Sequence, residues 1–236
     1  MTPIGLFRGE RALVTGSASN IGRAIALALA REGAAVRCVD VDAERNAATV
    51  ADIAREGGTA LAVTADLSTA DGWRSALPPE TEPVSIFVHS ASPQRREADT
   101  ALAVTEAIWD GMVNTNVRSG FFIARELGRR MQGLAQAGGI KGRMLFITSL
   151  HAESPRNLPH YSASKAGQTM VVKELARALG PSGIRVNALA PGAVPAGASM
   201  PQRSTSPAWC RSAGWGGRRT WPTWRWPCSP TASPAM

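Results

Sequence analysis

The stretch Arg11-Ala-Leu-Val-Thr-Gly16-Ser-Ala-Ser-Asn-Ile-Gly22 decides the fold of this chain. Its apolar beginning predicts a short buried strand that ends at Gly16. Apolar residues then recur at helical spacing from Ile21 to Leu29, and Gly33 ends that helix. Gly16 permits a tight turn, and Gly22 permits close packing of the helix on the strand. The stretch therefore predicts a strand, a glycine turn and a helix in succession.

The glycine turn has the chemistry of a phosphate-binding site. A helix that starts directly after such a turn offers unpaired N–H groups and the positive end of its dipole to a pyrophosphate. Ser17, Ser19 and Asn20 can add side-chain hydrogen bonds. Asn20 stands where a third glycine is usual, and asparagine tolerates a positive φ better than most residues. We therefore expect the turn to bind a dinucleotide.

An acid follows at the end of the next strand. Residues 35–39 predict this strand, and Asp40 at its end would hydrogen-bond a ribose 2′-hydroxyl. The Asp40 carboxylate would repel a 2′-phosphate, the turn holds no Arg or Lys to attract one, and Arg37 should point away. These features favour NAD over NADP, with NADP as the alternative. Asp40 could also be a helix N-cap, which is compatible with binding a ribose.

Strands and helices continue to alternate along the chain. Further strands are predicted at residues 60–63, 84–88, 143–148 and 184–189. Helices are predicted at 43–55, at about 105–132 with a bend near 114–116, and after Tyr161, where Met170, Val171, Leu175, Ala178 and Leu179 form the helical pattern. Strands that are apolar on both faces indicate a parallel sheet covered on both sides. The fold class is therefore α/β, a doubly wound three-layer sandwich with a sheet of six strands, and a seventh strand is not expected.

Chemistry-bearing residues gather at the ends of these strands. Gly16, Asp40, Asp66, Ser90, Ser149 and Pro191 all fall at or just after a predicted strand end. Because doubly wound sheets bind ligands beyond the carboxyl ends of their strands, these residues should form one site.

Tyr161-Ser-Ala-Ser-Lys165 supplies a candidate proton-transfer pair. Residues four apart lie on one helix face, so the phenol and the ammonium can point into the same cleft. A free phenol, with a pKa of about 10, is a poor acid or base at neutral pH, and a nearby cation stabilises the phenolate. Tyr161 is the only tyrosine in the chain. The alternative is an exposed pair on an amphipathic helix.

Composition narrows the class of protein. The chain has 236 residues, 44% of them hydrophobic, which suits one globular domain with a sizeable core. We expect no membrane partner, because no apolar run is long enough to span a bilayer and the start lacks a signal pattern. The three cysteines have neither metal spacing nor a disulfide pattern, so no metal site and a cytoplasmic location are expected.

The net charge of +8 does not indicate nucleic-acid binding. Residues 196–236 hold five arginines and no acid, which leaves 21 basic and 18 acidic residues in the rest of the chain. The body of the protein is therefore close to neutral.

Taken together, the motifs resemble the short-chain dehydrogenase/reductase family, classical type, over residues 8 to about 195. The resemblance rests on Thr15-Gly16-x-x-x-Asn20-Ile21-Gly22, Asp66-Leu67, Asn116, Ile147-Thr-Ser149, Tyr161-x-x-x-Lys165 and Arg185-Val-Asn-Ala-Leu-Ala-Pro191-Gly192, in that order. It implies a Rossmann fold and the interconversion of a secondary alcohol and a ketone with NAD.

The resemblance also implies residue roles. Tyr161 would be the general acid/base, Lys165 would support it and hold the nicotinamide ribose, Ser149 would hydrogen-bond the substrate oxygen, and Asn116 would fix a water in the proton relay. The implied cofactor-binding residues are Gly16, Ser19, Asn20, Ile21, Gly22, Asp40, Asp66, Leu67, Ser90, Ala91, Tyr161, Lys165, Pro191, Gly192 and Val194.

Some roles stay open. Thr148 competes with Ser149, because the spacing from Ser149 to Tyr161 is one residue shorter than the family usually has. Asn116 could merely kink its helix. His89, His151 and His160 receive no catalytic role, although His160 could shape the pocket. The expected partners are a small alcohol or carbonyl substrate and further copies of the chain, as a dimer or tetramer.

The chain changes character near residue 196. Residues 196–236 contain no Leu, Ile, Val, Phe or Tyr, yet hold five of the seven tryptophans, without helical or strand periodicity. We therefore expect a domain over residues 1–195 and a poorly ordered tail, and interpret the tail as the product of a reading-frame shift. A genuine Arg/Trp tail that contacts a membrane or nucleic acid is the alternative. Loss of the family's lid and last strand would leave a cofactor-binding protein with little activity, which is the second functional hypothesis.

Overall fold

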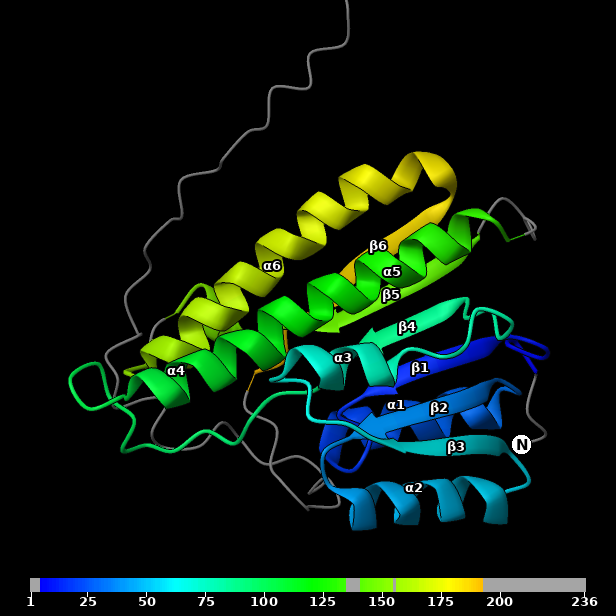
Figure 1. Cartoon of the computed structure of the whole chain (residues 1–236), viewed down its shortest axis with the longest axis horizontal. Helices are drawn as coiled ribbons and strands as arrows, with labels where there is room; N and C mark the ends of the chain where they lie inside the picture. Colours follow the sequence, from blue (N-terminus) through cyan, green and yellow to red (C-terminus); the bar gives the residue numbers. More distant parts are fainter. Residues whose placement is uncertain (1–4, 135–140, 155, 193–236) are drawn as a thin grey trace, which may run out of the picture. The chain divides into compact units, whose positions relative to one another are not determined.

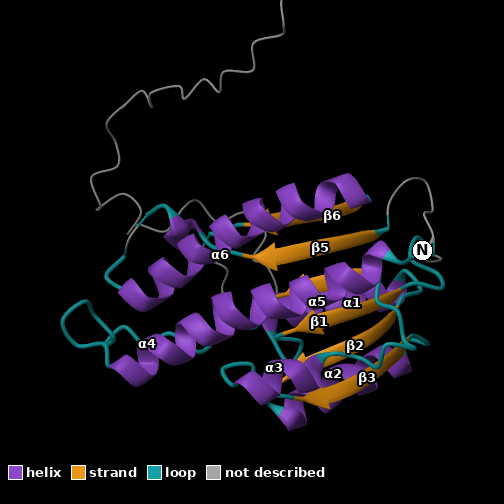
Figure 2. Cartoon of the chain, turned by 45° about the horizontal axis from the view of Figure 1, so that its top comes forward, coloured by secondary structure: helices purple, strands orange, loops and turns teal. Residues whose placement is uncertain are grey.

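Six parallel strands form the centre of the protein. The computed structural model describes residues 5–134, 141–154 and 156–192. The strands are β1 (Arg11–Thr15), β2 (Ala35–Asp40), β3 (Thr59–Thr64), β4 (Ile86–His89), β5 (Gly142–Ile147) and β6 (Ile184–Leu189). Their order in the sheet is β3-β2-β1-β4-β5-β6, and every pairing is parallel, so all arrows point the same way (Figure 2). This confirms the predicted doubly wound sheet.

Helices cover both faces of the sheet (Figure 1). One face packs against α1 (Asn20–Arg31) and α2 (Ala43–Arg55), and the other against α3 (Ala70–Ala76), α5 (Gly120–Gln132) and α6 (Pro159–Leu179). Helix α4 (Glu106–Val113) precedes α5 and contacts α6. The sheet separates two apolar cores, and successive residues of each central strand contribute alternately to one core and the other. Leu13 and Phe87 face α5, while Val14 and Val88 face α1. The three layers agree with the prediction.

The edge strands depart from the sequence pattern. Leu61 in β3 is 54% exposed and Leu189 in β6 is 50% exposed. The sequence predicted that both faces of every strand would be buried, and this is wrong for the two edge strands. An edge strand has one hydrogen-bonded neighbour and less helix above it, which the apolar composition alone does not reveal. The sequence also missed α3, a helix of only seven residues. The predictions of a missing seventh strand, of a role for Val194 and of a poorly ordered tail all concern residues outside those that the structure describes.

The predicted bend in the long helix is a turn of π-helix. Residues Asn114–Ser119 form it between α4 and α5, and Asn116 within it is fully buried. Gly120, the first residue after the π-turn, lies against the His89 ring. A Cβ at Gly120 would stand 2.7 Å from the His89 Cδ2 atom, so a side chain there would push the ring away. The π-turn and the glycine together let the helix approach the end of β4.

Helix α6 buries a polar face toward the sheet. Tyr161, Lys165, Gln168 and Val172 are buried at successive helical turns. The expected apolar face was wrong for Met170, which is 55% exposed, and for Ala178, which is also exposed. The hydrophobic pattern was misleading because the buried face of this helix carries functional groups.

Candidate active site

The glycine turn between β1 and α1 adopts the conformation that its sequence predicts. Gly16 has a φ of +70°, and a Cβ there would lie 2.6 Å from the Ala91 backbone nitrogen. A Cβ at Gly22 would lie 2.0 Å from the Gly16 carbonyl oxygen. Asn20 has a φ of +47°, so the asparagine takes the left-handed conformation expected of it. Only glycine fits at the first two positions.

The start of α1 is suited to an anion. Ser19 is the N-cap residue, yet its side chain makes no capping hydrogen bond to the first turn. The N–H groups there therefore lack a side-chain acceptor, and the helix dipole adds positive potential. Ser17 does not contribute as expected. Its buried hydroxyl donates to Asn46 Oδ1 over 2.8 Å, which braces the turn from α2.

Asp40 reaches the same turn from the end of β2. Its Oδ2 accepts from the Ala18 N–H at 2.9 Å and its Oδ1 from the Asp42 N–H at 3.0 Å. The N-cap of α2 is Asp42, whose carboxylate accepts from the Arg45 N–H, so the alternative N-cap role for Asp40 is wrong. Arg37 donates to the Ala76 carbonyl on α3, as expected of a residue that points away from the turn.

Two further strand ends contribute to the same edge. Asp66 is exposed after β3, with Oδ1 accepting from the Ser68 N–H. Leu67 beside it is 5% exposed and its side chain belongs to the core, which leaves only its backbone for a ligand. After β4, the N–H groups of Ser90 and Ala91 both donate to Thr15 Oγ1, at 3.2 and 3.3 Å.

Tyr161 and Lys165 lie side by side in α6. The Lys165 ammonium is 5.6 Å from the centre of the Tyr161 ring. Both residues are buried, Lys165 with 2% and Tyr161 with 8% of its surface exposed. Lys165 Nζ donates to the Ile147 carbonyl at 2.8 Å and to Gln168 Oε1 at 3.1 Å. Burial, with a smaller contribution from the Arg95 cation, lowers the Lys165 pKa from 10.5 to about 7. The exposed pair considered as an alternative is therefore excluded.

The hydrogen bonds of Ser149 and Thr148 show which of the two hydroxyls can reach a ligand. The Thr148 hydroxyl donates to the Leu189 carbonyl at 3.1 Å and so belongs to the β5–β6 connection. Ser149 Oγ instead accepts from the His151 N–H at 3.2 Å, which leaves the Ser149 hydroxyl hydrogen to turn toward a ligand. The geometry favours Ser149 over Thr148.

Asn116 connects α6 with the π-turn. Its amide nitrogen donates to Ser164 Oγ at 2.8 Å, and its backbone carbonyl accepts from Gln168 Nε2 at 3.1 Å. Its buried Oδ1 has no hydrogen-bond partner within the described parts of the chain. Because Gln168 also accepts from Lys165, a continuous path of hydrogen bonds runs from Lys165 through Gln168 to Asn116.

The loop after β5 meets the end of β6. The Leu150 N–H donates to the Pro191 carbonyl at 3.3 Å, and the Leu150 side chain lies next to Gly192. Pro191 and Gly192 thus stand at the same edge as Ser149. Val194 falls outside the described residues.

The edge has the donor chemistry of a dinucleotide site. The turn offers backbone N–H groups without a capping side chain, the two glycines leave no room for a Cβ, and Asp40 supplies a carboxylate at the turn. These features match a pyrophosphate and an adjoining ribose. The residues therefore fit NAD or NADP, with the turn of α1 as the phosphate end and Tyr161, Lys165 and Ser149 at the reacting end.

Comparison with known proteins agrees with this geometry. The family model described as short chain dehydrogenase matches residues 10–207. This chain belongs to the short-chain dehydrogenase/reductase family. The chain is 36% identical over 191 residues to the probable galactose dehydrogenase GalD of Rhizobium meliloti, covering 79% of this chain and 72% of that protein.

Two further similarities concern relatives with dehydrogenase names. It is 32% identical over 188 residues to 2-dehydro-3-deoxy-D-gluconate 5-dehydrogenase of Escherichia coli, covering 78% of this chain and 71% of that protein. A crystal structure of a putative NAD(P) dependent gluconate 5-dehydrogenase from Beutenbergia cavernae, with bound NADP, is 30% identical with a TM-score of 0.72. The matched region covers 88% of this chain and 78% of the chain in that structure. Membership places this chain in an oxidoreductase family that binds NAD(P).

His89 is a structural residue of this short-chain dehydrogenase that sequence reasoning missed. The fully buried ring lies 2.9 Å from Thr15 Oγ1 through Nδ1 and 3.2 Å from the Asn116 carbonyl through Nε2. Burial lowers the His89 pKa to about 3, so the ring is neutral. Because a carbonyl can only accept, Nε2 carries the proton and Nδ1 accepts from Thr15. His89 thus joins the glycine turn to the π-turn.

Gln168 and Arg95 were also missed. Gln168 was invisible because its neighbours in sequence predict an apolar helix face. Arg95 lies in the loop between β4 and α4, and its guanidinium carbon is 4.6 Å from the centre of the Tyr161 ring. His151 packs edge-on against the same ring at 5.1 Å between ring centres. The only sequence signal for Arg95 is a pair of arginines just after a strand end.

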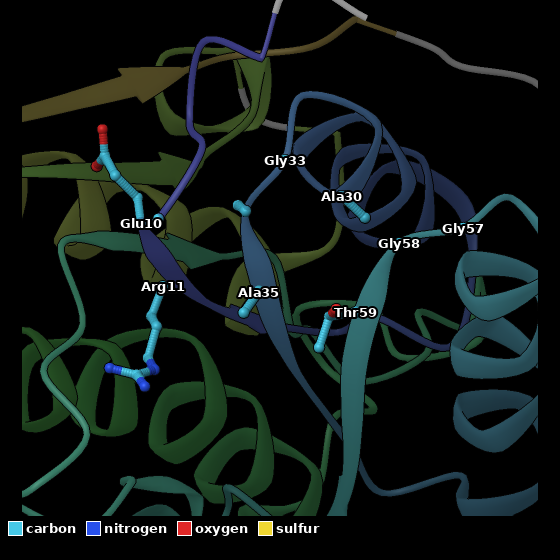
Figure 3. A pocket seen from close by; sticks show the side chains of 10 residues that line it. Glu10, Arg11, Ala30, Gly33, Ala35, Gly57, Gly58 and Thr59 are labelled. Atoms are coloured by element: carbon cyan, nitrogen blue, oxygen red, sulfur yellow. The ribbon is translucent and has the colours of Figure 1, made fainter.

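The protein also has a hollow at the opposite edge of the sheet (Figure 3). It has a volume of about 300 Å³ and is lined by the first residues of three strands, Arg11, Ala35 and Thr59. Ligands of doubly wound sheets bind at the carboxyl edge, so this hollow is not the active site.

Two kinds of feature do not occur in the described parts of the chain. No group of three or more His, Cys, Asp or Glu side chains is arranged to hold a metal ion there. None of the described helices is both long enough and apolar enough to cross a membrane.

Proposed function

We propose that the protein is an NAD(H)-dependent oxidoreductase that interconverts a secondary alcohol and a ketone, with Tyr161 as general acid/base. The observation that carries the proposal is the burial of Tyr161 beside Lys165, in a helix that packs against the short turn following Ser149. The related proteins that act on galactose and on a deoxygluconate are dehydrogenases, which supports the reaction class.

The chain's own groups account for the proton. In the oxidation, the alcohol hydroxyl gives its proton to the Tyr161 phenolate, while the Ser149 hydroxyl donates a hydrogen bond to the same oxygen. Lys165 stabilises the phenolate electrostatically, and the path through Gln168 to Asn116 holds the Lys165 ammonium in place. When bound, NAD⁺ would supply the acceptor for the hydride that leaves the carbinol carbon, with NADH as the product. Hydride and proton together balance the conversion of alcohol to ketone.

NAD is proposed over NADP because of the charges near the glycine turn. Asp40 and Asp42 place two carboxylates there, and the arginines in the first turns of α1 and α2 have acidic partners. Arg45 pairs with Asp42 at 3.4 Å, and Arg23 pairs with Asp52. A 2′-phosphate would face negative charge without a free cation among these residues. The related gluconate dehydrogenase structure holds NADP, so the preference must be measured.

Location and assembly remain part of the proposal. A cytoplasmic enzyme that forms a dimer or tetramer is expected, without nucleic-acid or membrane partners. The tail from residue 196 is proposed to result from a reading-frame shift, which resequencing of the source DNA would test. An unbroken frame supported by many reads would contradict it.

The test compares the wild-type chain with Tyr161→Phe. We expect wild type to bind NADH, measured by fluorescence, and to oxidise members of a panel of secondary alcohols. Tyr161→Phe should keep NADH affinity and lose turnover by about a hundredfold to ten-thousandfold, the usual contribution of general acid/base catalysis. Met170→Leu, an exposed change in the same helix, serves as the control and should retain activity.

The second hypothesis is a cofactor-binding protein of the same fold with little activity. Its support is the unusual composition of residues 196–236. NADH binding without turnover, unchanged in Tyr161→Phe, would favour it over the enzyme.

A further inference from the structure

A cation lies directly over the proposed acid/base. The Arg95 guanidinium carbon is 4.6 Å from the centre of the Tyr161 ring, and the Arg95 side chain belongs to an exposed residue of the β4–α4 loop. The ion pairs found among the described residues do not include Arg95. No hydrogen bond from the Arg95 guanidinium is found among the described residues either, which leaves its N–H donors for a ligand beside Tyr161.

Two further nitrogen-bearing side chains, Lys165 and His151, lie close to the same ring. Lys165 Nζ is 5.6 Å from the ring centre, and the His151 ring is 5.1 Å from it. Arg95 acts on both of these neighbours. Burial is the largest cause of the lowered pKa of both Lys165 and His151, and the positive charge of Arg95 is the second. Arg156 also lowers the pKa of His151. Arg95 and protonated Lys165 thus repel each other, and Arg95 disfavours the charged form of His151.

The acid of the same loop does not relieve this repulsion at Tyr161. Asp99 is buried and its Oδ2 lies 4.0 Å from His160 Nε2, the neighbour of Tyr161 in sequence. The ion pair found for Asp99 among the described residues is with His160 and not with Arg95. A site that gathers cations at its reacting centre is stabilised by a bound anion, because the anion offsets their mutual repulsion.

We propose that the substrate carries an oxyanion, a carboxylate or a phosphate, which the Arg95 guanidinium binds while the substrate hydroxyl lies at Tyr161. His151, whose ring packs edge-on against Tyr161, can supply a second N–H. A guanidinium fork matches two oxygens of either anion. Because the cation stacks on the phenol itself, the charge must lie within a few bonds of the reacting carbon, as in a short hydroxy acid. This proposal rests on the proposed alcohol oxidation and names its substrate class.

The test uses Arg95→Gln with Arg96→Gln as the matched control. Arg96 is the next residue of the same loop and is exposed, and no contact of its side chain with Tyr161 is found in the described structure. The substrates are 3-hydroxybutyrate, its methyl ester and 3-hydroxybutyl phosphate. These share a secondary alcohol and differ in charge, so a carboxylate and a phosphate are tested separately.

We expect wild type to prefer the acid or the phosphate over the neutral ester. Arg95→Gln should lower kcat/KM for the preferred anion by about tenfold to a hundredfold, the usual effect of losing a hydrogen bond to a charged group, and leave the ester nearly unchanged. Arg96→Gln should change neither. A loss that is equal for anion and ester would mean that Arg95 acts on Tyr161 alone and would overturn the proposal.

The outcomes separate this proposal from the proposed function. Turnover of the ester without preference for either anion overturns the anion site and leaves the oxidoreductase intact. If the chain turns over none of the three, titration calorimetry with malonate, phosphate and neutral 1,3-propanediol decides. Binding of either anion that weakens about tenfold or more in Arg95→Gln supports the site, and absence of anion binding overturns it.

Discussion

Gln168→Leu is the substitution whose effect follows most directly from the structure. The Gln168 side chain is 1% exposed, accepts from Lys165 Nζ at 3.1 Å and donates to the Asn116 carbonyl at 3.1 Å. Leucine has a similar size and can do neither. The change therefore removes two buried hydrogen bonds without creating a large cavity.

The expected cost can be worked out from these two bonds. A hydrogen bond to a charged group contributes about 1.5–3 kcal/mol and a neutral one about 0.5–1.5 kcal/mol. Each partner keeps one other bond, Lys165 to the Ile147 carbonyl and the Asn116 carbonyl to His89, so neither is wholly unsatisfied. We expect the free energy of unfolding to fall by about 2–4 kcal/mol, which lowers Tm by roughly 2–4 °C per kcal/mol in a domain of this size.

The assay is urea unfolding at fixed protein concentration, at about pH 6 and about pH 9. Because burial lowers the Lys165 pKa to about 7, the lost bond is charge-assisted at the lower pH and neutral at the higher one. The cost should therefore be larger at about pH 6, by roughly 1 kcal/mol. Gln132→Leu, which removes an exposed hydrogen bond to Ser182, is the control and should cost less than about 0.5 kcal/mol.

A double-mutant cycle that combines Gln168→Leu with Lys165→Met measures the interaction energy between Gln168 and Lys165. We expect a coupling energy of about 1–3 kcal/mol between Gln168 and Lys165. A cost for Gln168→Leu no greater than that of the control, or no coupling with Lys165→Met, would refute the proposed path from Lys165 to Asn116.

Three further predictions concern charge. Between pH 7 and 10.5 the unfolded chain binds more protons at Lys165 than the folded chain, so stability should rise with pH across that window, and Lys165→Met should remove this rise in urea unfolding. His89, with its pKa lowered to about 3, must stay neutral to fold, so stability should fall as pH drops below 6.5, by up to about 1.4 kcal/mol per pH unit. His89→Asn should reduce this acid sensitivity in the same assay, and an unchanged pH profile would argue against the neutral ring. Asp40→Asn should lower the affinity ratio of NAD to NADP by about tenfold in titration calorimetry, and an unchanged ratio would remove Asp40 from cofactor selection.

The fold was predictable because its signals are local and repeated. Each buried strand is a short apolar run that ends at a Gly, Asp or Ser, and each central strand appeared within a residue or two of its predicted bounds. Gly16 and Asn20 adopt the positive φ values that their residue types suggest. The edge strands and α3 were less clear, because exposure at a sheet edge and a helix of two turns leave weak patterns in composition.

The site was predictable only where a residue type carries its own chemistry. Tyr161 and Lys165 share a helix face by their spacing alone, and the structure buries them together. Gln168 and Arg95 were missed because their importance depends on contacts between distant segments. His89 looked incidental for the same reason, since its partners lie 74 and 27 residues away.

The most direct test of the account follows the hydride and the proton together. A secondary alcohol labelled with deuterium at the carbinol carbon is incubated with NAD⁺ and the full chain, and the label on the nicotinamide is measured by mass spectrometry. We predict that wild type transfers the label to C4 of the nicotinamide, and that Tyr161→Phe, which still binds NADH, transfers at least about a hundredfold less. Equal transfer by both proteins, or none by wild type with NADH bound, would contradict the role assigned to Tyr161.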